Sequence, residues 1–375
     1  MKEGICMFRC LLLALVSVTA LFAQDAARKM QKLEKGLELK RKDLVKAARF
    51  IEKRVPSYLK KQKYYLPAKE TGLKHDVECD ERTKACFIVL KGKKAFLGEG
   101  ACKTVHKAIQ YHPKKPKIVA RATQKANRSR EHQLTQELHG KRGLFQTVGF
   151  GSNKKKGNLY RTIYSKVYSP GSLHDVLEND TPFSIREKMK IAAGIISGLA
   201  SLHEEGIVHR DLGARNYLID IPKGKVGNRA IQAHIADFGR ATYAERAADT
   251  KVQGNTKYTS PEGLVRNKMK GKHYYKSDIF AVGCVLYWLY HGQKPSWLEK
   301  SYIKDGSGSN SHRFHQLRWR VDHAIKKRRD ALKGKVDPKK TFERLILQML
   351  HTNPKARPSA KRLSYKMDKL IGRVV

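Results

Sequence analysis

Two glycines in the first third of the chain are spaced as in a loop that binds phosphate. Residues 97–108 read L-G-E-G-A-C-K-T-V-H-K-A, with Gly98 and Gly100 followed by Val105. Because glycine has no side chain, the backbone amides of such a loop can approach a phosphate group closely. Paired glycines are also common in β-hairpin turns, so on this segment alone a plain hairpin stays open.

Three later segments carry acidic and amide side chains in a recognisable order. They read I-V-H-R-D-L-G-A-R-N-Y-L-I at 207–219, I-A-D-F-G at 235–239 and S-P-E at 260–262. Together they resemble the catalytic loop, the metal-binding D-F-G motif and the A-P-E motif of eukaryotic-type protein kinases. The resemblance covers residues 90–373, and chance does not explain the ordered set as it could explain one motif.

The resemblance implies transfer of the γ-phosphate of ATP to a protein hydroxyl, with Mg²⁺ as the metal. Asp211 then corresponds to the catalytic base that accepts or orients the proton of the substrate hydroxyl. Asn216 and Asp237 correspond to the metal ligands, and amide and carboxylate oxygens are the hard ligands that Mg²⁺ prefers. The other nucleotide contacts correspond to Gly98, Gly100, Val105 and Ala120.

The phosphate-binding lysine of kinases is not at its usual place. The third kinase strand usually ends in V-A-I-K, whereas residues 117–124 read K-I-V-A-R-A-T-Q, with Ala122 at the lysine position. Arg121 is no substitute, because successive side chains of a strand point to opposite faces. Lys103 lies two residues before Val105 and therefore on its face of the preceding strand. This placement resembles the with-no-lysine kinases and predicts Lys103 as the phosphate-binding lysine; the alternative is a pseudokinase.

The glutamate that partners this lysine in kinases is expected on the next helix. Residues 131–138 read E-H-Q-L-T-Q-E-L, which resembles the regulatory helix of kinases, with its glutamate seven residues before a leucine. That spacing selects Glu131 over Glu137. Glu131 follows Ala122 by only nine residues, a short distance for a strand, a turn and half a helix.

The class of acceptor hydroxyl stays open. Arg215 in D-L-G-A-R-N resembles tyrosine kinases, whereas G-N-T-K-Y at 254–258 is close to a serine/threonine kinase pattern. Kinases with an arginine before the catalytic aspartate, as Arg210 here, pair it with a phosphate on the activation segment. The candidate sites for that phosphate, with Thr250 first, are Tyr243, Thr250, Thr256 and Tyr258.

The elements that must position these residues can also be predicted. Ser184 and Glu187 form a capping-box pattern that opens an apolar helix before the catalytic loop. Asp278 and Gly283, in S-D-I-F-A-V-G, match the start of the buried central helix of the larger kinase lobe.

Further along, Arg357 in N-P-K-A-R-P-S matches the arginine that pairs with the glutamate of A-P-E, here Glu262. We therefore expect an α+β fold with two lobes. A small β-rich N-lobe would span 75–168 and a larger helical C-lobe 169–375, with the nucleotide hinge in 165–173.

A leader and a basic extension precede this domain. Residues 1–23 hold an uninterrupted apolar stretch behind Lys2 and Arg9, typical of a signal peptide or a signal anchor. The protein would then be secreted or membrane-anchored. Residues 24–74 are predicted to be a basic helical extension with an apolar stripe that includes Leu44, Ile51 and Val55. The stripe would either lie on an anionic membrane or pack on the following domain.

Cysteine usage leaves one question open. Cys79 and Cys86 flank the short stretch C-D-E-R-T-K-A-C. In an oxidising compartment the pair could close a hairpin; ordinary thiols are the favoured interpretation, because six cysteines are too few for a disulfide-built scaffold of this size.

Composition limits the class of protein. The chain has 375 residues, 78 Lys+Arg against 34 Asp+Glu, a net charge of +44 and a hydrophobic fraction of 40%. That apolar content excludes wholesale disorder, and the lack of a second long apolar run excludes a multi-span membrane protein. The charge predicts an anionic partner, either an acidic protein or a membrane surface, besides the protein substrate. Since no nucleic-acid motif accompanies the charge, nucleic acid is not expected.

Two other functions compete with protein phosphorylation. One is a pseudokinase or docking module that binds nucleotide or a partner without catalysis, and the intact Asp211, Asn216 and Asp237 argue against it. The other is a small-molecule phosphotransferase of related fold. S-P-E, Asp278 and Arg357 argue against that function, because they resemble the substrate platform of protein kinases.

Overall fold

The computed structural model of the chain describes residues 40–99, 103–113, 115–126, 130–222, 225–227, 229–247, 258–264, 273–298, 310–332 and 337–372. Two compact units divide the chain, the first up to residue 128 with 147–167, the second 129–146 with 168 onward. The sequence placed 129–146 in the N-lobe. The structure groups this segment with the second unit, where Leu144 bridges Ile235 and the Phe145 N–H donates to the Ile235 carbonyl at 2.9 Å.

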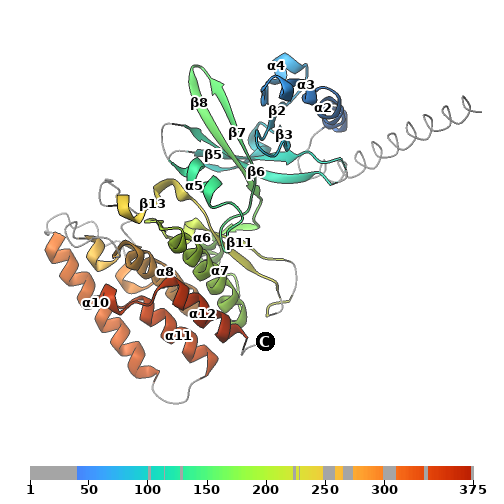
Figure 1. Cartoon of the computed structure of the whole chain (residues 1–375). Helices are drawn as coiled ribbons and strands as arrows, with labels where there is room; N and C mark the ends of the chain where they lie inside the picture. The colour runs from blue at the N-terminus through green and yellow to red at the C-terminus, as the bar shows by residue number, and fades with distance from the viewer. Residues whose placement is uncertain are drawn as a thin grey trace, which may run out of the picture. The chain divides into compact units, whose positions relative to one another are not determined.

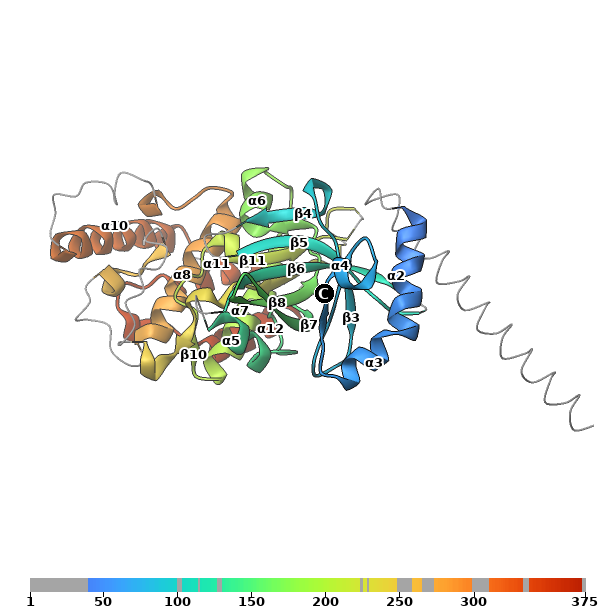
Figure 2. The same cartoon turned by 90° about the horizontal axis from the view of Figure 1, so that it is seen from above.

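The first unit is built on an eight-stranded antiparallel sheet (Figure 2). The strand order is β1-β2-β3-β5-β6-β8-β7, and β4 pairs with β5 off this path. The strands are β1 (Tyr65–Leu66), β2 (Asp76–Cys79), β3 (Cys86–Val89), β4 (Phe96–Glu99), β5 (Lys103–Gln110), β6 (Lys117–Lys125), β7 (Thr147–Lys155) and β8 (Asn158–Lys166). The last of these ends inside the segment predicted as the hinge, and the unit boundary follows Val167.

This sheet curls until β7 lies against β2 and β3. The Phe150 N–H of β7 donates to Asp80 Oδ2 at 2.6 Å, just past the end of β2. Glycines permit the close approach, since a Cβ at Gly151 would lie 2.4 Å from Glu78 Oε1. Inside the curl the rings of Phe87 and Tyr164 stack with centroids 3.7 Å apart.

The described part of the basic extension, from residue 40 on, packs on the same unit, whereas residues 24–39 lie outside the described residues (Figure 1). Its helices are α2 (Arg41–Lys53), α3 (Val55–Lys60) and α4 (Ala68–Thr71). Leu44, Ile51 and Val55 are buried in one cluster with Ile88 and Ile109 of the sheet. Each such side chain contributes roughly 1.5–3 kcal/mol of transfer free energy. The apolar stripe of α2 and α3 is therefore committed to the sheet and is not available to a membrane surface.

A disulfide joins Cys79 and Cys86. The two residues are direct cross-strand partners in the β2–β3 pair, and both are buried among the apolar side chains under the extension. The favoured interpretation as ordinary thiols is wrong for this pair. Spacing along the chain could not decide the question, because it does not report the strand register that brings the two Cβ atoms together.

Reduction of this disulfide is expected to lower the free energy of unfolding by about 2–3 kcal/mol, because the unfolded chain gains freedom. Urea unfolding with and without dithiothreitol measures the change. The Cys79→Ala/Cys86→Ala variant is the control, and its unfolding midpoint is expected to be insensitive to the reductant. An unchanged midpoint of reduced wild-type protein would contradict a stabilising cross-link.

The second unit is mainly helical. Its helices are α5 (Glu131–Glu137), α6 (Leu173–Glu178), α7 (Ile185–Glu204), α8 (His273–His291), α10 (Asn310–Ala331), α11 (Pro338–Met349) and α12 (Ala360–Ile371). Short strands accompany them: β9 (Pro170–Ser172), β10 (Ile207–Val208), β11 (Tyr217–Asp220), β12 (Gln232–Ile235) and β13 (Thr242–Tyr243). Its 3₁₀ turns include η2 (Ala214–Asn216), η3 (Phe238–Arg240) and η6 (Pro261–Leu264).

Helices α7 and α8 form the centre of this unit, with α12 beside α7 and α11 beside α8 (Figure 1). The predicted capping box is confirmed: Ser184 Oγ accepts from the Glu187 N–H, and the Glu187 carboxylate accepts from the Ser184 N–H. Gly283 allows α8 to approach α11, because a Cβ there would lie 3.0 Å from Met349 Cβ. No helix within the described ranges is both long enough and apolar enough to cross a membrane.

Candidate active site

The β11–β12 hairpin brings two of the predicted site residues to one end. Tyr217 is the cross-strand partner of Ile235, so that Asn216 precedes one strand where Ala236 and Asp237 follow the other. The Ala236 N–H donates to the Asn216 carbonyl at 2.9 Å and extends the pairing by one step. Asn216 and Asp237 are therefore neighbours because of strand register, although 21 residues separate them in the sequence.

Asp211 joins this pair through the catalytic-loop turn. Asn216 Nδ2 donates to the Asp211 main-chain carbonyl at 2.6 Å. This bond occupies the amide nitrogen and leaves the amide oxygen as the group that could bind a cation. The Asp211 carboxylate is contacted by the Arg240 guanidinium, with Nε 3.5 Å from Oδ2. The structure thus brings Asp211, Asn216 and Asp237 to one end of the β11–β12 hairpin.

Asp237 is held in an unusual backbone conformation. Its φ is 66°, in the left-handed region, and its Oδ1 accepts from the Gly239 N–H at 3.4 Å. Residues other than glycine occupy this region at a cost, and they concentrate at functional sites. The conformation turns the chain sharply where β12 ends, and Phe238, the next residue, is buried in the core of the unit.

The buried carboxylate of Asp278 accepts hydrogen bonds from the backbone of the catalytic loop. Its Oδ2 accepts from the His209 N–H at 2.8 Å, and its Oδ1 accepts from the Arg210 N–H at 2.9 Å. Hydrogen bonds to a carboxylate are stronger than neutral ones, so that Asp278 fixes the two residues before Asp211. Asp278, which the sequence matched to the start of the central helix, therefore positions the catalytic loop.

Arg210 contacts the segment that follows D-F-G. Its Nε and Nη2 both donate to the Arg240 carbonyl, at 2.9 and 2.6 Å. Burial lowers the pKa of Arg210 from its usual value. Of the candidate phosphorylation sites, Thr250 and Thr256 lie outside the described residues, whereas Tyr243 and Tyr258 lie within them.

Tyr243 makes a contact that the sequence did not reveal. Its hydroxyl donates to Glu137 Oε2 at 2.7 Å, and this hydrogen bond raises the pKa of Tyr243. Strand β13 carries Tyr243 and pairs with β10, whereas Glu137 ends α5, 106 residues away. No local pattern marks such a pair, since it depends on the packing of two distant elements.

The two glutamates of α5 have different environments. Glu131 is buried at the start of the helix, and a Cβ at Gly239 would lie 3.8 Å from its Oε2. Glu137 is exposed and binds Tyr243. Of the two glutamates, Glu131 is thus the one beside the D-F-G turn.

The first unit carries the predicted nucleotide-facing residues on β4, β5 and β6. Val105 is the cross-strand partner of Ala122 and also of Gly98, and Lys107 is the partner of Ala120. Lys103 pairs with Gln124, two residues beyond the Val105–Ala122 pair and therefore on the same face as Val105. An ammonium group at Lys103 therefore projects from the face to which a lysine at 122 would belong. Gly100 lies outside the described residues.

Arg121 points to the other face, as the alternation of strand side chains predicted. Its Nη2 lies 3.0 Å from Glu78 Oε2, and its Nε donates to Tyr164 Oη at 3.1 Å. The Tyr164 hydroxyl also donates to Glu78 Oε2, at 2.6 Å. Arg121 thus belongs to a buried structural network and is not the missing phosphate-binding residue.

Glu262 and Arg357 form the predicted pair. Arg357 Nη1 lies 2.5 Å from Glu262 Oε1, and Nη2 lies 2.9 Å from Oε2. Both residues are buried, and Arg357 also donates to the His351 carbonyl at 2.6 Å. The pair ties η6, which carries the S-P-E motif, to the segment before α12.

Loss of one partner of this pair is expected to destabilise the protein strongly. Arg357→Met leaves Glu262 as a buried charge without its counter-ion and should lower the free energy of unfolding by about 3–5 kcal/mol. Chemical unfolding of Arg357→Met, of Glu262→Gln and of the double variant measures these losses in the free energy of unfolding. The double variant Glu262→Gln/Arg357→Met should lose less than the two single changes added together. Strict additivity would show that the two side chains do not interact.

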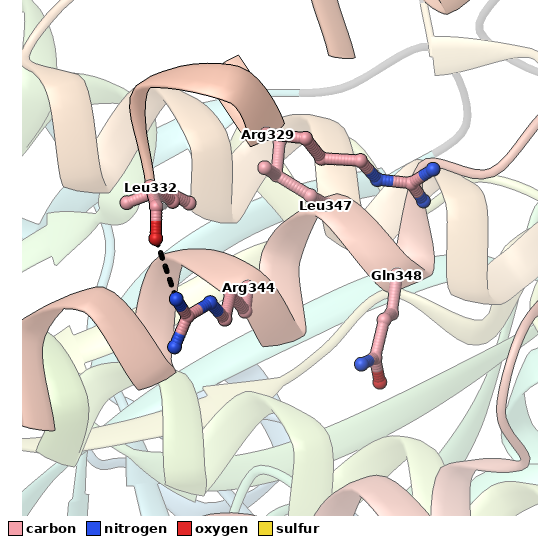
Figure 3. A pocket seen from close by; sticks show the side chains of 5 residues that line it. All are labelled: Arg329, Leu332, Arg344, Leu347 and Gln348. Carbon is pink, nitrogen blue, oxygen red and sulfur yellow. Dashed lines mark hydrogen bonds between the residues drawn. The ribbon is translucent and has the colours of Figure 1, made fainter. Parts of the chain in front are cut away.

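A separate hollow of 360 Å³ lies between the end of α10 and α11. It is lined by Arg329, Leu332, Arg344, Leu347 and Gln348, and Arg344 donates to the Leu332 carbonyl at 2.5 Å (Figure 3). None of the residues predicted from the motifs lines it, so it is not part of the candidate active site.

Comparison with known proteins agrees with the geometry. Residues 92–366 match the sequence model of the protein kinase domain family. The chain is 27% identical over 244 residues to the LRR receptor-like serine/threonine-protein kinase GSO1 of Arabidopsis thaliana, covering 59% of this chain and 18% of that protein. It is 28% identical over 210 residues to the serine/threonine-protein kinase PLK4 of Drosophila melanogaster, covering 53% and 25%.

A third relative is the proline-rich receptor-like protein kinase PERK7 of Arabidopsis thaliana, 31% identical over 218 residues, or 54% of this chain and 28% of that protein. The chain thus matches less than two thirds of the length of each of these relatives.

Proposed function

Because the chain belongs to the protein kinase family, we propose that it transfers the γ-phosphate of ATP to a hydroxyl group of a protein substrate. The observation that carries the proposal is the convergence of Asp211, Asn216 and Asp237 at the end of the β11–β12 hairpin. Phosphoryl transfer requires mainly positioning and neutralisation of charge. These three side chains supply the positioning and the oxygen ligands for the metal ion that would neutralise the charge.

Each residue of the catalytic loop has a distinct part. Asp211 accepts the proton of the substrate hydroxyl or orients that hydroxyl for attack. The hydrogen bond from Asn216 and the two bonds to Asp278 hold the Asp211 backbone in place. A preorganised loop of this kind costs no rearrangement when the substrate arrives.

The donor set fits Mg²⁺. The Asn216 amide oxygen and the Asp237 carboxylate are hard oxygen ligands, and the bond from Asn216 Nδ2 to Asp211 leaves that oxygen as an acceptor. When bound, ATP would supply the transferable phosphoryl group, and the metal would neutralise the negative charge of that group. In the first unit, Lys103 is proposed as the residue that binds the phosphates, with Val105 and Ala120 against the base. Gly98 and Gly100 are proposed as the glycines whose backbone amides approach the phosphates.

The acceptor is proposed to be serine or threonine, because GSO1 and PLK4 are described as serine/threonine kinases. A pseudokinase is the second candidate, and the single observation in its favour is Ala122 at the usual lysine position.

The disulfide supports a further proposal, that a leader in residues 1–23 directs the chain through an oxidising compartment. Sequencing the N-terminus of the mature protein would show whether that leader is cleaved.

A transfer assay tests the main proposal. The full chain is incubated with γ-labelled ATP, Mg²⁺ and a panel of protein acceptors, and labelled phosphoserine, phosphothreonine and phosphotyrosine are separated. Mg²⁺-dependent label on serine or threonine, abolished by EDTA, is the expected result. Nucleotide binding without transfer to itself or to any acceptor would favour the docking module instead.

A further inference from the structure

A basic groove opens on the face of the first unit's sheet to which Arg121 points. Its volume is 890 Å³. The floor is formed by Thr104, His106, Arg121 and Thr123 of β5 and β6, and the register pairs Thr104 with Thr123 and His106 with Arg121. These residues lie on the face opposite to Lys103 and Val105, so that the groove is distinct from the proposed nucleotide-binding face.

Two walls rise from this floor. One is the turn of the β7–β8 hairpin, with Asn153, Lys154, Lys155 and Lys156. The other includes Lys69 at α4 and Lys91 after β3. Residues 65–91 precede the part of the chain that matches the kinase family, 92–366. The second wall is therefore a feature of this chain and not a property carried over from the family.

The groove carries a large excess of positive charge. Six of its lining side chains are cationic, whereas Asp76 is the acidic one. Asp76 is paired with Lys91 at 2.8 Å, and Arg121 is paired with Glu78. Lys69 and the three hairpin lysines are exposed, and within the described part of the chain they form no ion pair.

The floor offers neutral hydrogen-bond donors between the two walls. Thr123 Oγ1 is buried and has no hydrogen-bond partner among the described residues. A buried hydroxyl in that state favours an incoming acceptor. Lysines are flexible point charges rather than planar forks, so that they suit several carboxylates in varied positions.

From these features we infer that the groove binds an extended, acidic segment of a protein substrate or partner. Alternate side chains of an extended segment point to opposite sides, and here each side meets lysines. A flat bilayer could contact the rims but not the floor. The inference rests on the proposed function only in naming a substrate of the kinase, because the binding itself needs no phosphoryl transfer.

The test is fluorescence anisotropy with a labelled peptide of alternating Glu and Ser residues, and with the matching Gln and Ser peptide. The Glu peptide should bind the full chain, weaken with added salt, and bind equally well to Asp211→Asn. Lys154→Glu/Lys155→Glu/Lys156→Glu should weaken binding by about tenfold or more. Lys69→Glu, on the opposite wall, should also weaken it.

The matched control is Lys326→Glu/Lys327→Glu/Arg328→Glu, which makes the same change of charge on an exposed part of α10. Its affinity should stay within about twofold of wild type, since none of the three residues lines the groove and exposed charges are screened by salt. Equal weakening by both triple variants would contradict the inference, because it would show that the peptide responds to the overall charge of the protein and not to the groove. Tighter groove-dependent binding of single-stranded RNA or of phosphatidylserine vesicles would overturn the choice of ligand.

Discussion

Asp211→Asn is expected to lower the rate of phosphoryl transfer by about 10³-fold and to leave the affinity for Mg²⁺–ATP within about twofold. The amide that replaces the carboxylate cannot accept the substrate proton. The fold of the loop should survive, because Asn216 binds the main-chain carbonyl of residue 211 and not its side chain. Initial rates with saturating ATP, together with nucleotide titration of the inactive variant, separate the two effects.

A surface carboxylate serves as the control for Asp211. Asp368 on α12 is exposed and forms a surface ion pair with Arg142 at 3.3 Å. Asp368→Asn should therefore keep the wild-type rate, since exposed pairs contribute little. If Asp211→Asn retained substantial phosphoryl transfer, Asp211 would not be the catalytic base, and another residue would have to accept the substrate proton.

Lys103→Met is expected to lower transfer by about 10²-fold, with a weaker affinity for ATP, because a charge on the phosphates is lost. A lysine restored at the usual kinase position should compensate in part. Ala122 is the cross-strand partner of Val105, which lies two residues from Lys103 and therefore on the same sheet face. The variant Lys103→Met/Ala122→Lys is thus expected to recover activity above that of Lys103→Met alone.

The control for this lysine lies next to its cross-strand partner. Lys125 follows Gln124 on β6 and its side chain belongs to the opposite face. Lys125→Met removes the same charge and should change neither rate nor affinity by more than about twofold. Full activity of Lys103→Met would exclude Lys103 as the phosphate-binding residue.

The catalytic half of the site was predictable because its residues are close in sequence or in fixed register. Asp211 and Asn216 share one turn, and Asp237 follows the strand that pairs with β11. Asp278 and the Glu262–Arg357 pair came from motif matches rather than from physics, and the bonds that Asp278 accepts from His209 and Arg210 were not predicted. The geometry gives the physical reason for these residue types, since Asp278 and the Glu262–Arg357 pair each satisfy buried polar groups.

The curl of the first unit was not predictable in the same way. Its contacts join residues far apart, such as Arg121 with Glu78 and Phe150 with Asp80. No periodicity in the sequence records which strand will meet which. The glycines at 149 and 151 became informative only once β7 was seen against β2 and β3. The groove and the Tyr243–Glu137 contact were missed for the same reason.

The approach of β7 to β2 and β3 has a consequence for solubility. A nine-residue strand at the end of a sheet normally presents a row of unpaired N–H and C=O groups, and such a row can template pairing with another chain. Here the Phe150 N–H on that side is taken by the Asp80 carboxylate, and lysines occupy the last positions of the strand. The curled sheet thereby protects its own edge against aggregation.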